Sequence, residues 1–172
     1  MRKNIIVLAT LILLASKSFG QENKSQNMLG QFTVEINMTG SYAYHNIKEL
    51  GFNGNVGYEF VPNLQALAHY ESTVGLYDDD NTKTHFSSNA LGGGLAYKFM
   101  KSTDGSSVDA RFIVAQTIGG CDWKKTVYDA GIQWKMRGGL SPTISLGFRH
   151  ENSHTTGIPN MNIVYGSLGI RL

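Results

Sequence analysis

The sequence lacks several features on which common protein classes depend. Cys121 is its single cysteine, so no internal disulfide can form, and no Cys/His spacing resembles a zinc site. Fifteen basic residues nearly balance thirteen acidic ones, which gives no electrostatic basis for binding nucleic acid. We therefore expect no metal, no other cofactor and no nucleic-acid partner.

Long apolar runs are also missing. The longest run, Ile5–Ala15, has eleven residues. It is too short to span the roughly 30 Å of a hydrocarbon core. It follows the basic pair Arg2–Lys3 and precedes Ser18 and Gly20, which stand at the −3 and −1 positions that signal peptidase reads. The pattern predicts a signal peptide over residues 1–20, cleaved after Gly20.

Cleavage would leave a mature chain of 152 residues (172 minus 20), enough for a single domain over residues 21–172. It would also remove Arg2, Lys3 and Lys17. The mature chain would then carry 12 basic and 13 acidic residues, a net charge of −1.

What the mature sequence does have is alternation with a period of two, and it shows no convincing 3.6-residue apolar stripe. In the first segment, for example, Phe32, Val34 and Ile36 share one face, while Glu35 and Asn37 share the other. Eight such segments cover residues 32–39, 52–60, 64–74, 90–99, 108–118, 128–136, 143–149 and 164–172. Alternation repeated in this way indicates eight β-strands.

The connections between these segments alternate in length. The short ones are Val61–Asn63, Lys101–Ser107 and Arg137–Pro142. The longer, polar ones are Ser41–Glu49, Tyr77–His85, Gly119–Lys125 and Glu151–Pro159. Short turns at one end and long loops at the other are typical of outer-membrane barrels with periplasmic termini. We therefore predict an all-β fold, an eight-stranded antiparallel up-and-down transmembrane β-barrel.

Alternation alone does not say which face points inward. A soluble barrel such as a lipocalin would turn its apolar face inward and enclose an apolar ligand. The charges of the polar face favour the membrane orientation, because opposite signs could compensate one another in a narrow lumen. The predicted lumen charge network comprises Glu35, Glu59, Glu71, Asp109 and Asp129 against Lys98, Arg111, Lys135, Arg149 and Arg171.

The aromatic residues of the apolar face also favour a membrane, because they gather at the strand ends. Phe32, Phe60, Phe99 and Trp134 stand at the short-turn ends, and Tyr42, Phe52, Tyr128 and Phe148 stand towards the long loops. Two aromatic girdles flanking an apolar band are typical of membrane barrels. A soluble lipocalin-like carrier remains the alternative architecture.

The hairpin organisation and the closing segment Tyr165–Leu172 resemble the small eight-stranded outer-membrane barrels, the group that includes OmpX and the transmembrane domain of OmpA. The ending Gly169-Ile170-Arg171-Leu172 is similar to the family's Gly-x-Arg-aromatic terminus, with Leu172 in place of the aromatic residue. The resemblance implies a monomer in the bacterial outer membrane. Its partners would be membrane lipid, lipopolysaccharide and the barrel-assembly machinery.

The function that this reading implies is non-enzymatic, with a barrel that anchors surface loops for envelope integrity or surface interaction. Eight strands leave an interior filled by side chains, so we do not expect a general porin.

The segment Arg149–His154, followed by Gly157 and by Pro159–Asn160, supports an enzymatic alternative. It is similar to the His-x-Ser-Asn motif of the PagL-type lipid A deacylases, which are also eight-stranded barrels. That resemblance implies acyl ester hydrolysis, with His150 and Ser153 as the candidate catalytic pair. Asn152 stands where the family has its nucleophilic Ser, and the closing segment has no acidic residue to orient the imidazole.

Overall fold

The computed structural model describes residues 32–41, 46–79 and 82–172, so the expected signal peptide and Tyr42 lie outside the described residues. Its strands are β1 (Phe32–Ser41), β2 (Ile47–Val61), β3 (Leu64–Asp79), β4 (Thr82–Lys101), β5 (Ser107–Thr117), β6 (Lys125–Lys135), β7 (Ser141–Ser153) and β8 (Met161–Arg171). In the described ranges, no helix is long and apolar enough to cross a membrane.

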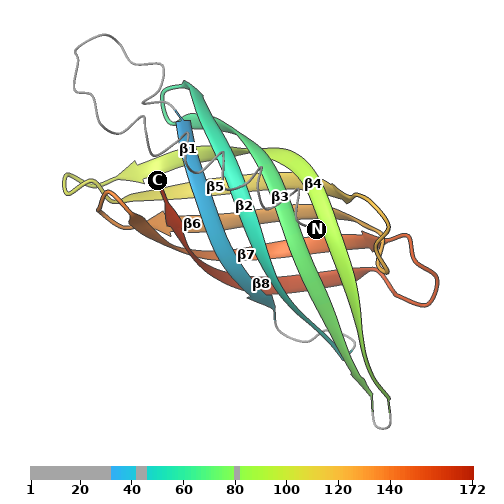
Figure 1. Ribbon diagram of the computed structural model, residues 1–172. Helices are drawn as coiled ribbons and strands as arrows, with labels where there is room; N and C mark the ends of the chain where they lie inside the picture. The colour runs from blue at the N-terminus through green and yellow to red at the C-terminus, as the bar shows by residue number, and fades with distance from the viewer. Residues whose placement is uncertain (1–31, 42–45, 80–81) are drawn as a thin grey trace. The chain divides into compact units, whose positions relative to one another are not determined.

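Each strand pairs with its sequence neighbours, and β8 returns to pair antiparallel with β1 (Figure 1). At this seam Val34 and Leu172 exchange two backbone hydrogen bonds of 3.2 and 2.8 Å. Closure satisfies the backbone groups that an open sheet would leave at its two edges. The predicted eight-stranded antiparallel barrel is confirmed.

The barrel is polar inside and apolar outside. On β6 and β7, for example, Leu146 is 67% exposed on the outer face, whereas Gln133 is fully buried inside. The same alternation runs through the other strands. A large apolar surface turned outward is costly in water and stable in lipid. The lipocalin-like alternative, which needs the apolar face inside, is therefore wrong.

Most of the predicted aromatic girdle residues lie exposed on the outer face. Phe60, Phe99 and Trp134 are exposed at the short-turn ends, and Phe52, Tyr128 and Phe148 are exposed towards the long loops. Rings at both ends of the outward apolar surface occupy the positions where a bilayer meets water.

Several strands are longer at the long-loop end than the sequence predicted. Residues Glu49, Lys125 and Glu151, all assigned to loops from the sequence, are part of β2, β6 and β7. The predicted loop Tyr77–His85 is largely strand, because β3 and β4 continue as a hairpin that reaches farther than its neighbours (Figure 1). At this end of the barrel, polar residues such as His150 stand in the outer row in place of apolar ones. The pattern of apolar residues outside and polar residues inside, which identifies a strand in the sequence, is therefore lost there.

The lumen is narrow, and glycines make room for its larger side chains. A Cβ on Gly147 would lie 2.5 Å from the ring of Tyr165, so only glycine fits beneath that ring. Leu67, an exception to the alternation in the sequence, points inward and packs with Ala96 and Ile113. Side chains therefore fill the interior.

The short connections are stabilised by local hydrogen bonds. In the turn between β4 and β5, the carboxylate of Asp104 accepts hydrogen bonds from the backbone N–H and the hydroxyl of Ser106, at 2.9 and 2.8 Å. The backbone hydrogen bond from Ser106 lowers the pKa of Asp104 below its ordinary value. In the β2–β3 turn, Asn63 adopts a left-handed conformation with φ of 68°, which asparagine tolerates better than most residues.

The outward apolar surface predicts that the cost of a charged substitution depends on its depth in the bilayer. Ile132 lies on the outer face of β6 between the girdle residues Tyr128 and Trp134. Ile132→Arg should lower the unfolding free energy in bilayers by about 2–4 kcal/mol, and Tyr128→Arg by about 1 kcal/mol or less, because the cost falls towards the interface. Urea titration of both variants in lipid vesicles measures the difference. Equal midpoints for the two variants and the parent would contradict a lipid-facing position for Ile132.

Candidate functional site

The ten charged residues predicted for the lumen all lie on the inner face of the barrel. Nine of them take part in ion pairs: Glu35, Glu59, Glu71, Lys98, Asp109, Arg111, Asp129, Arg149 and Arg171. Lys135 lies on the same face, partly buried, outside these pairs. Charges removed from water in this way are stable only when they are paired.

Arg171 is the centre of the pairs near the short-turn end. Its guanidinium donates to Glu35, to Asp109 at 2.8 Å and to the amide oxygen of Gln133 at 2.7 Å. Arg111 approaches the other oxygen of Glu35 at 2.9 Å. Closer to the rim, the less buried Lys98 and Glu59 form a looser pair at 3.4 Å. Three strands, β1, β5 and β6, are thus tied to the closing strand through the lumen.

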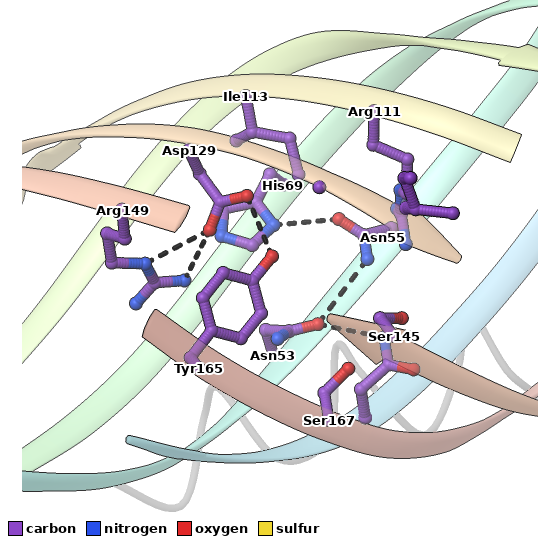
Figure 2. Close-up of a pocket in the computed structure, with 13 residues that line it drawn as sticks. Asn53, Asn55, His69, Arg111, Ile113, Asp129, Ser145, Arg149, Tyr165 and Ser167 are labelled. Atoms are coloured by element: carbon purple, nitrogen blue, oxygen red, sulfur yellow. Dashed lines mark hydrogen bonds and ion pairs between the residues drawn. The ribbon is translucent and has the colours of Figure 1, made fainter. Parts of the chain in front are cut away.

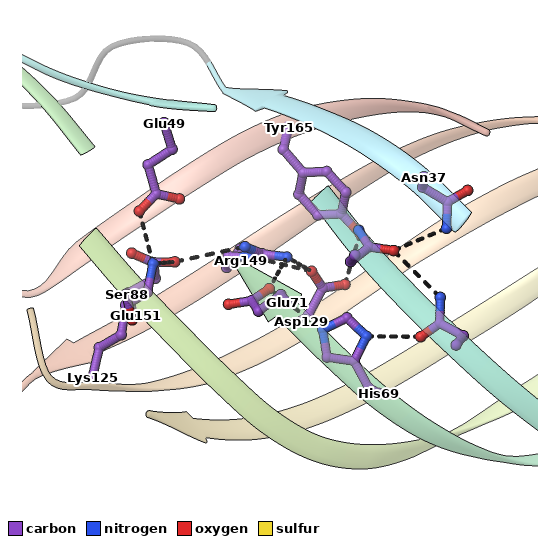
Figure 3. Close-up of polar contacts among 12 residues, drawn as sticks. Asn37, Glu49, His69, Glu71, Ser88, Lys125, Asp129, Arg149, Glu151 and Tyr165 are labelled. Carbon is purple, nitrogen blue, oxygen red and sulfur yellow. Dashed lines mark hydrogen bonds and ion pairs between the residues drawn. The ribbon is translucent and has the colours of Figure 1, made fainter. Parts of the chain in front are cut away.

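Arg149 has the same role at mid-barrel (Figure 3). It pairs with Asp129 at 3.0 Å and with Glu71 at 3.1 Å, and its guanidinium lies 5.0 Å from the ring centre of Tyr165. The Tyr165 hydroxyl donates to the second oxygen of Asp129 at 2.8 Å. These contacts join β3, β6, β7 and β8.

A third cluster at the long-loop end was not predicted from the sequence. The ammonium group of Lys125, which is fully buried, lies 2.8 Å from Glu49 and 2.7 Å from Glu151. It also lies 3.8 Å from the ring centre of Trp123, a cation–π contact. Strand parity could have identified all three charged residues. Glu49, Lys125 and Glu151 each stand an even number of positions from an inner-face residue of the same strand, namely Asn55, Asp129 and Arg149.

His69 and Asn55 connect these clusters. His69 Nδ1 lies 2.7 Å from the side-chain oxygen of Asn55, and its Nε2 lies 3.4 Å from Glu71. The amide nitrogen of Asn55 then donates to Glu35 at 3.3 Å. With the 3.8 Å contact of Arg149 and Glu151, the polar contacts run without a break from Lys125 to Asp109. These residues therefore form one connected network, and only the rim pair Lys98–Glu59 stands apart from it among the described ion pairs.

An apolar cluster closes the lumen beside Lys125. Its buried members are Ile47, Trp123, Met161 and Ile163, with Tyr77, Phe86 and Ile158 packed against them. Trp123 belongs to the connection before β6, and its backbone N–H donates to Ser87 at 3.1 Å, while its ring meets Phe86 edge-on at 5.4 Å. Such a layer keeps bulk water away from the buried charges at this end.

The structure does not bring the candidate catalytic pair together. His150 faces outward, with Nδ1 2.8 Å from the side-chain oxygen of Asn162 and its ring 6.3 Å from that of Tyr128. The hydroxyl of Ser153 instead accepts from the backbone N–H of Thr155 at 3.3 Å. No hydrogen bond joins His150 to Ser153 in the described part of the chain. Within those same ranges, no group of three or more His, Cys, Asp or Glu is arranged to hold a metal ion.

No protein family and no curated protein matches this sequence. Among solved structures, the chain is similar to the neisserial surface protein A, with 18% identity, a TM-score of 0.53, and 83% of this chain and 96% of that chain covered. It also matches a de novo designed transmembrane β-barrel (14% identity, TM-score 0.47, covering 81% and 95%). A third match is the N-terminal barrel domain of Pseudomonas aeruginosa OprF (16%, 0.44, covering 81% and 97%).

The fold of this chain is that of the small eight-stranded outer-membrane barrels, as the likeness to the neisserial protein shows. The expected resemblance to that group is therefore confirmed at the level of fold.

The buried network generates a prediction with a matched control one residue away. Lys125→Met leaves Glu49 without a cation and Glu151 with only its 3.8 Å contact to Arg149, so the unfolding free energy should fall by about 3–5 kcal/mol. The exposed neighbour Lys124 should cost under about 1 kcal/mol on the same change. Urea midpoints of both variants in detergent measure the difference. Equal midpoints would mean that the ammonium group of Lys125 is not enclosed.

Proposed function

We propose that this chain is an integral protein of a bacterial outer membrane, exported with a cleaved signal peptide, whose barrel anchors surface loops in a non-enzymatic role. The observation that carries the proposal is the distribution of polarity across the barrel wall, with a network of ion pairs inside and apolar side chains exposed outside. Such a wall matches lipid and not water.

The lumen is not an open pore in this proposal. Its cross-section is occupied by Arg149, Arg171 and Lys125 with their carboxylate partners, and the apolar cluster around Trp123 closes the long-loop end. Hydrated ions would have to displace buried ion pairs to pass. The role therefore lies in the membrane anchor and the surface it presents, either envelope integrity or surface interaction.

The proposed partners follow from the same geometry. Outer-membrane lipid and lipopolysaccharide would surround the apolar face of a monomer. The barrel-assembly machinery would engage the closing strand that ends in Gly169, Arg171 and Leu172. Support comes from the exposed outer residues of β8, of which Leu168 and Val164 are among the most exposed of the barrel.

Location is tested by export and fractionation. We expect the mature protein to begin at Gln21, to sediment with outer membranes, and to migrate faster on SDS gels when unheated. Membrane barrels of this kind keep their closed hydrogen-bonded wall in detergent. N-terminal sequencing and gel shift are the measurements. Recovery of most of the protein as a soluble periplasmic species without detergent would contradict the proposal.

Catalysis is tested on lipid A directly. We expect no loss of an acyl chain when the purified protein is incubated in outer-membrane-like bilayers, because His150 and the Ser153 hydroxyl have other partners and no carboxylate of the described residues orients the imidazole. Mass spectrometry of lipid A reads the result. Deacylation abolished by both His150→Ala and Ser153→Ala would overturn the non-enzymatic role.

A further inference from the structure

Most polar groups in the lumen have partners, but Arg111 is only half satisfied. One nitrogen of its guanidinium pairs with Glu35, while Nε and Nη2 are buried and have no hydrogen-bond partner in the described part of the chain. A guanidinium has five N–H donors, and leaving buried donors unpaired is costly. The other two arginines of the network, Arg149 and Arg171, have no orphaned nitrogens among the described residues.

A second orphaned group faces the same space. The hydroxyl of Ser145, on β7, is buried and also has no partner in the described ranges. Arg111, on β5, and Ser145 both line one cavity of about 20 Å³ in the middle of the lumen (Figure 2). Ser167, which is opposite Ser145 in the pairing of β7 with β8, lines it as well.

The size of the cavity limits its occupant. One water molecule needs about 10–15 Å³ of cavity volume, so a cavity of 20 Å³ accommodates a single water and no organic ligand. A buried water also needs two to four polar partners, and Arg111, Ser145 and Ser167 can supply three.

The charge of the lumen decides between a water and a monatomic anion. Among the residues whose side chains the structure describes, the inner face carries seven carboxylates, Glu35, Glu49, Glu59, Glu71, Asp109, Asp129 and Glu151, against six basic side chains, Lys98, Arg111, Lys125, Lys135, Arg149 and Arg171. Of these charged residues, Asp129, Arg111 and Arg149 line the cavity. Arg149 already pairs with Asp129 and Glu71, and Arg111 already pairs with Glu35, so carboxylates compensate both guanidinium groups. A buried anion would add a charge without a counterion of its own, whereas a neutral acceptor would not.

We propose that this cavity is a binding site for one structural water, which accepts a hydrogen bond from Arg111 and binds the hydroxyl of Ser145. The water completes the hydrogen bonding of Arg111 and links β5 to β7 and β8 across the lumen. Among the described residues, no side-chain hydrogen bond or ion pair joins β5 to β7, so the water supplies that link and is an integral part of the network. The site lies in the barrel interior and goes beyond the function proposed for the surface loops.

A crystal structure of the full protein, grown in a lipid mesophase with sodium bromide and at a resolution that shows ordered water, is the test. We expect a single density peak within hydrogen-bond distance of Arg111 and Ser145, without anomalous signal at the bromine edge. An anomalous peak would overturn the proposal in favour of an anion site. A cavity without density, or Arg111 turned to another partner, would overturn it as well.

Solution NMR in bicelles gives a second readout with a matched control. The Hε proton of Arg111 should show a cross-relaxation peak to a long-lived water in the parent and in Ser88→Val. Ser88 is also a buried inner-face serine, and it does not line the cavity. Ser145→Val fills the cavity with methyl groups, so the peak should disappear. A peak that survives in Ser145→Val would place the water elsewhere and contradict the site.

Discussion

In a closed barrel of only eight strands, buried charges must find their partners within the barrel itself. Arg171 shows the consequence most clearly, because one side chain near the end of the chain holds Glu35 from the first strand and Asp109 from the fifth. Breaking such a pair leaves a charge without water or counterion, which is far more costly than losing an exposed pair. Pairs such as Arg171–Asp109 and Arg149–Glu71 therefore couple strands that share no backbone hydrogen bonds.

The rest of the architecture accommodates this network. Glycines such as Gly147 leave space for Tyr165, whose hydroxyl anchors Asp129. The apolar cluster around Trp123 shields Lys125 and its two carboxylates at the long-loop end. On the other side of the wall, the outward rows carry no part of the network and are mostly apolar. One wall thus meets two environments because successive side chains of a strand point to opposite faces.

Much of the fold and of the lumen network could be predicted from the sequence, for a physical reason. Side chains on a strand alternate between faces, so alternation located eight strands and assigned Glu35, Arg111 and Arg149 to one face. It failed at the long-loop ends, where polar residues enter the outer row and apolar residues such as Ile47 and Met161 enter the inner one, and Glu49 and Lys125 were assigned to loops. Which charges pair depends on barrel register, which brings β5 opposite β1 across the lumen. Nothing local in the sequence specifies that.

The central claim is that the wall is apolar towards lipid and closed around a polar interior. The two tryptophans test it, because Trp134 is 49% exposed on the outer face and Trp123 is fully buried in the cluster that closes the lumen. In vesicles of brominated lipid, the fluorescence of Trp134 in a Trp123→Phe variant should be strongly quenched. The fluorescence of Trp123 in a Trp134→Phe variant should be nearly unchanged. Equal quenching of both, or none of Trp134, would contradict the account.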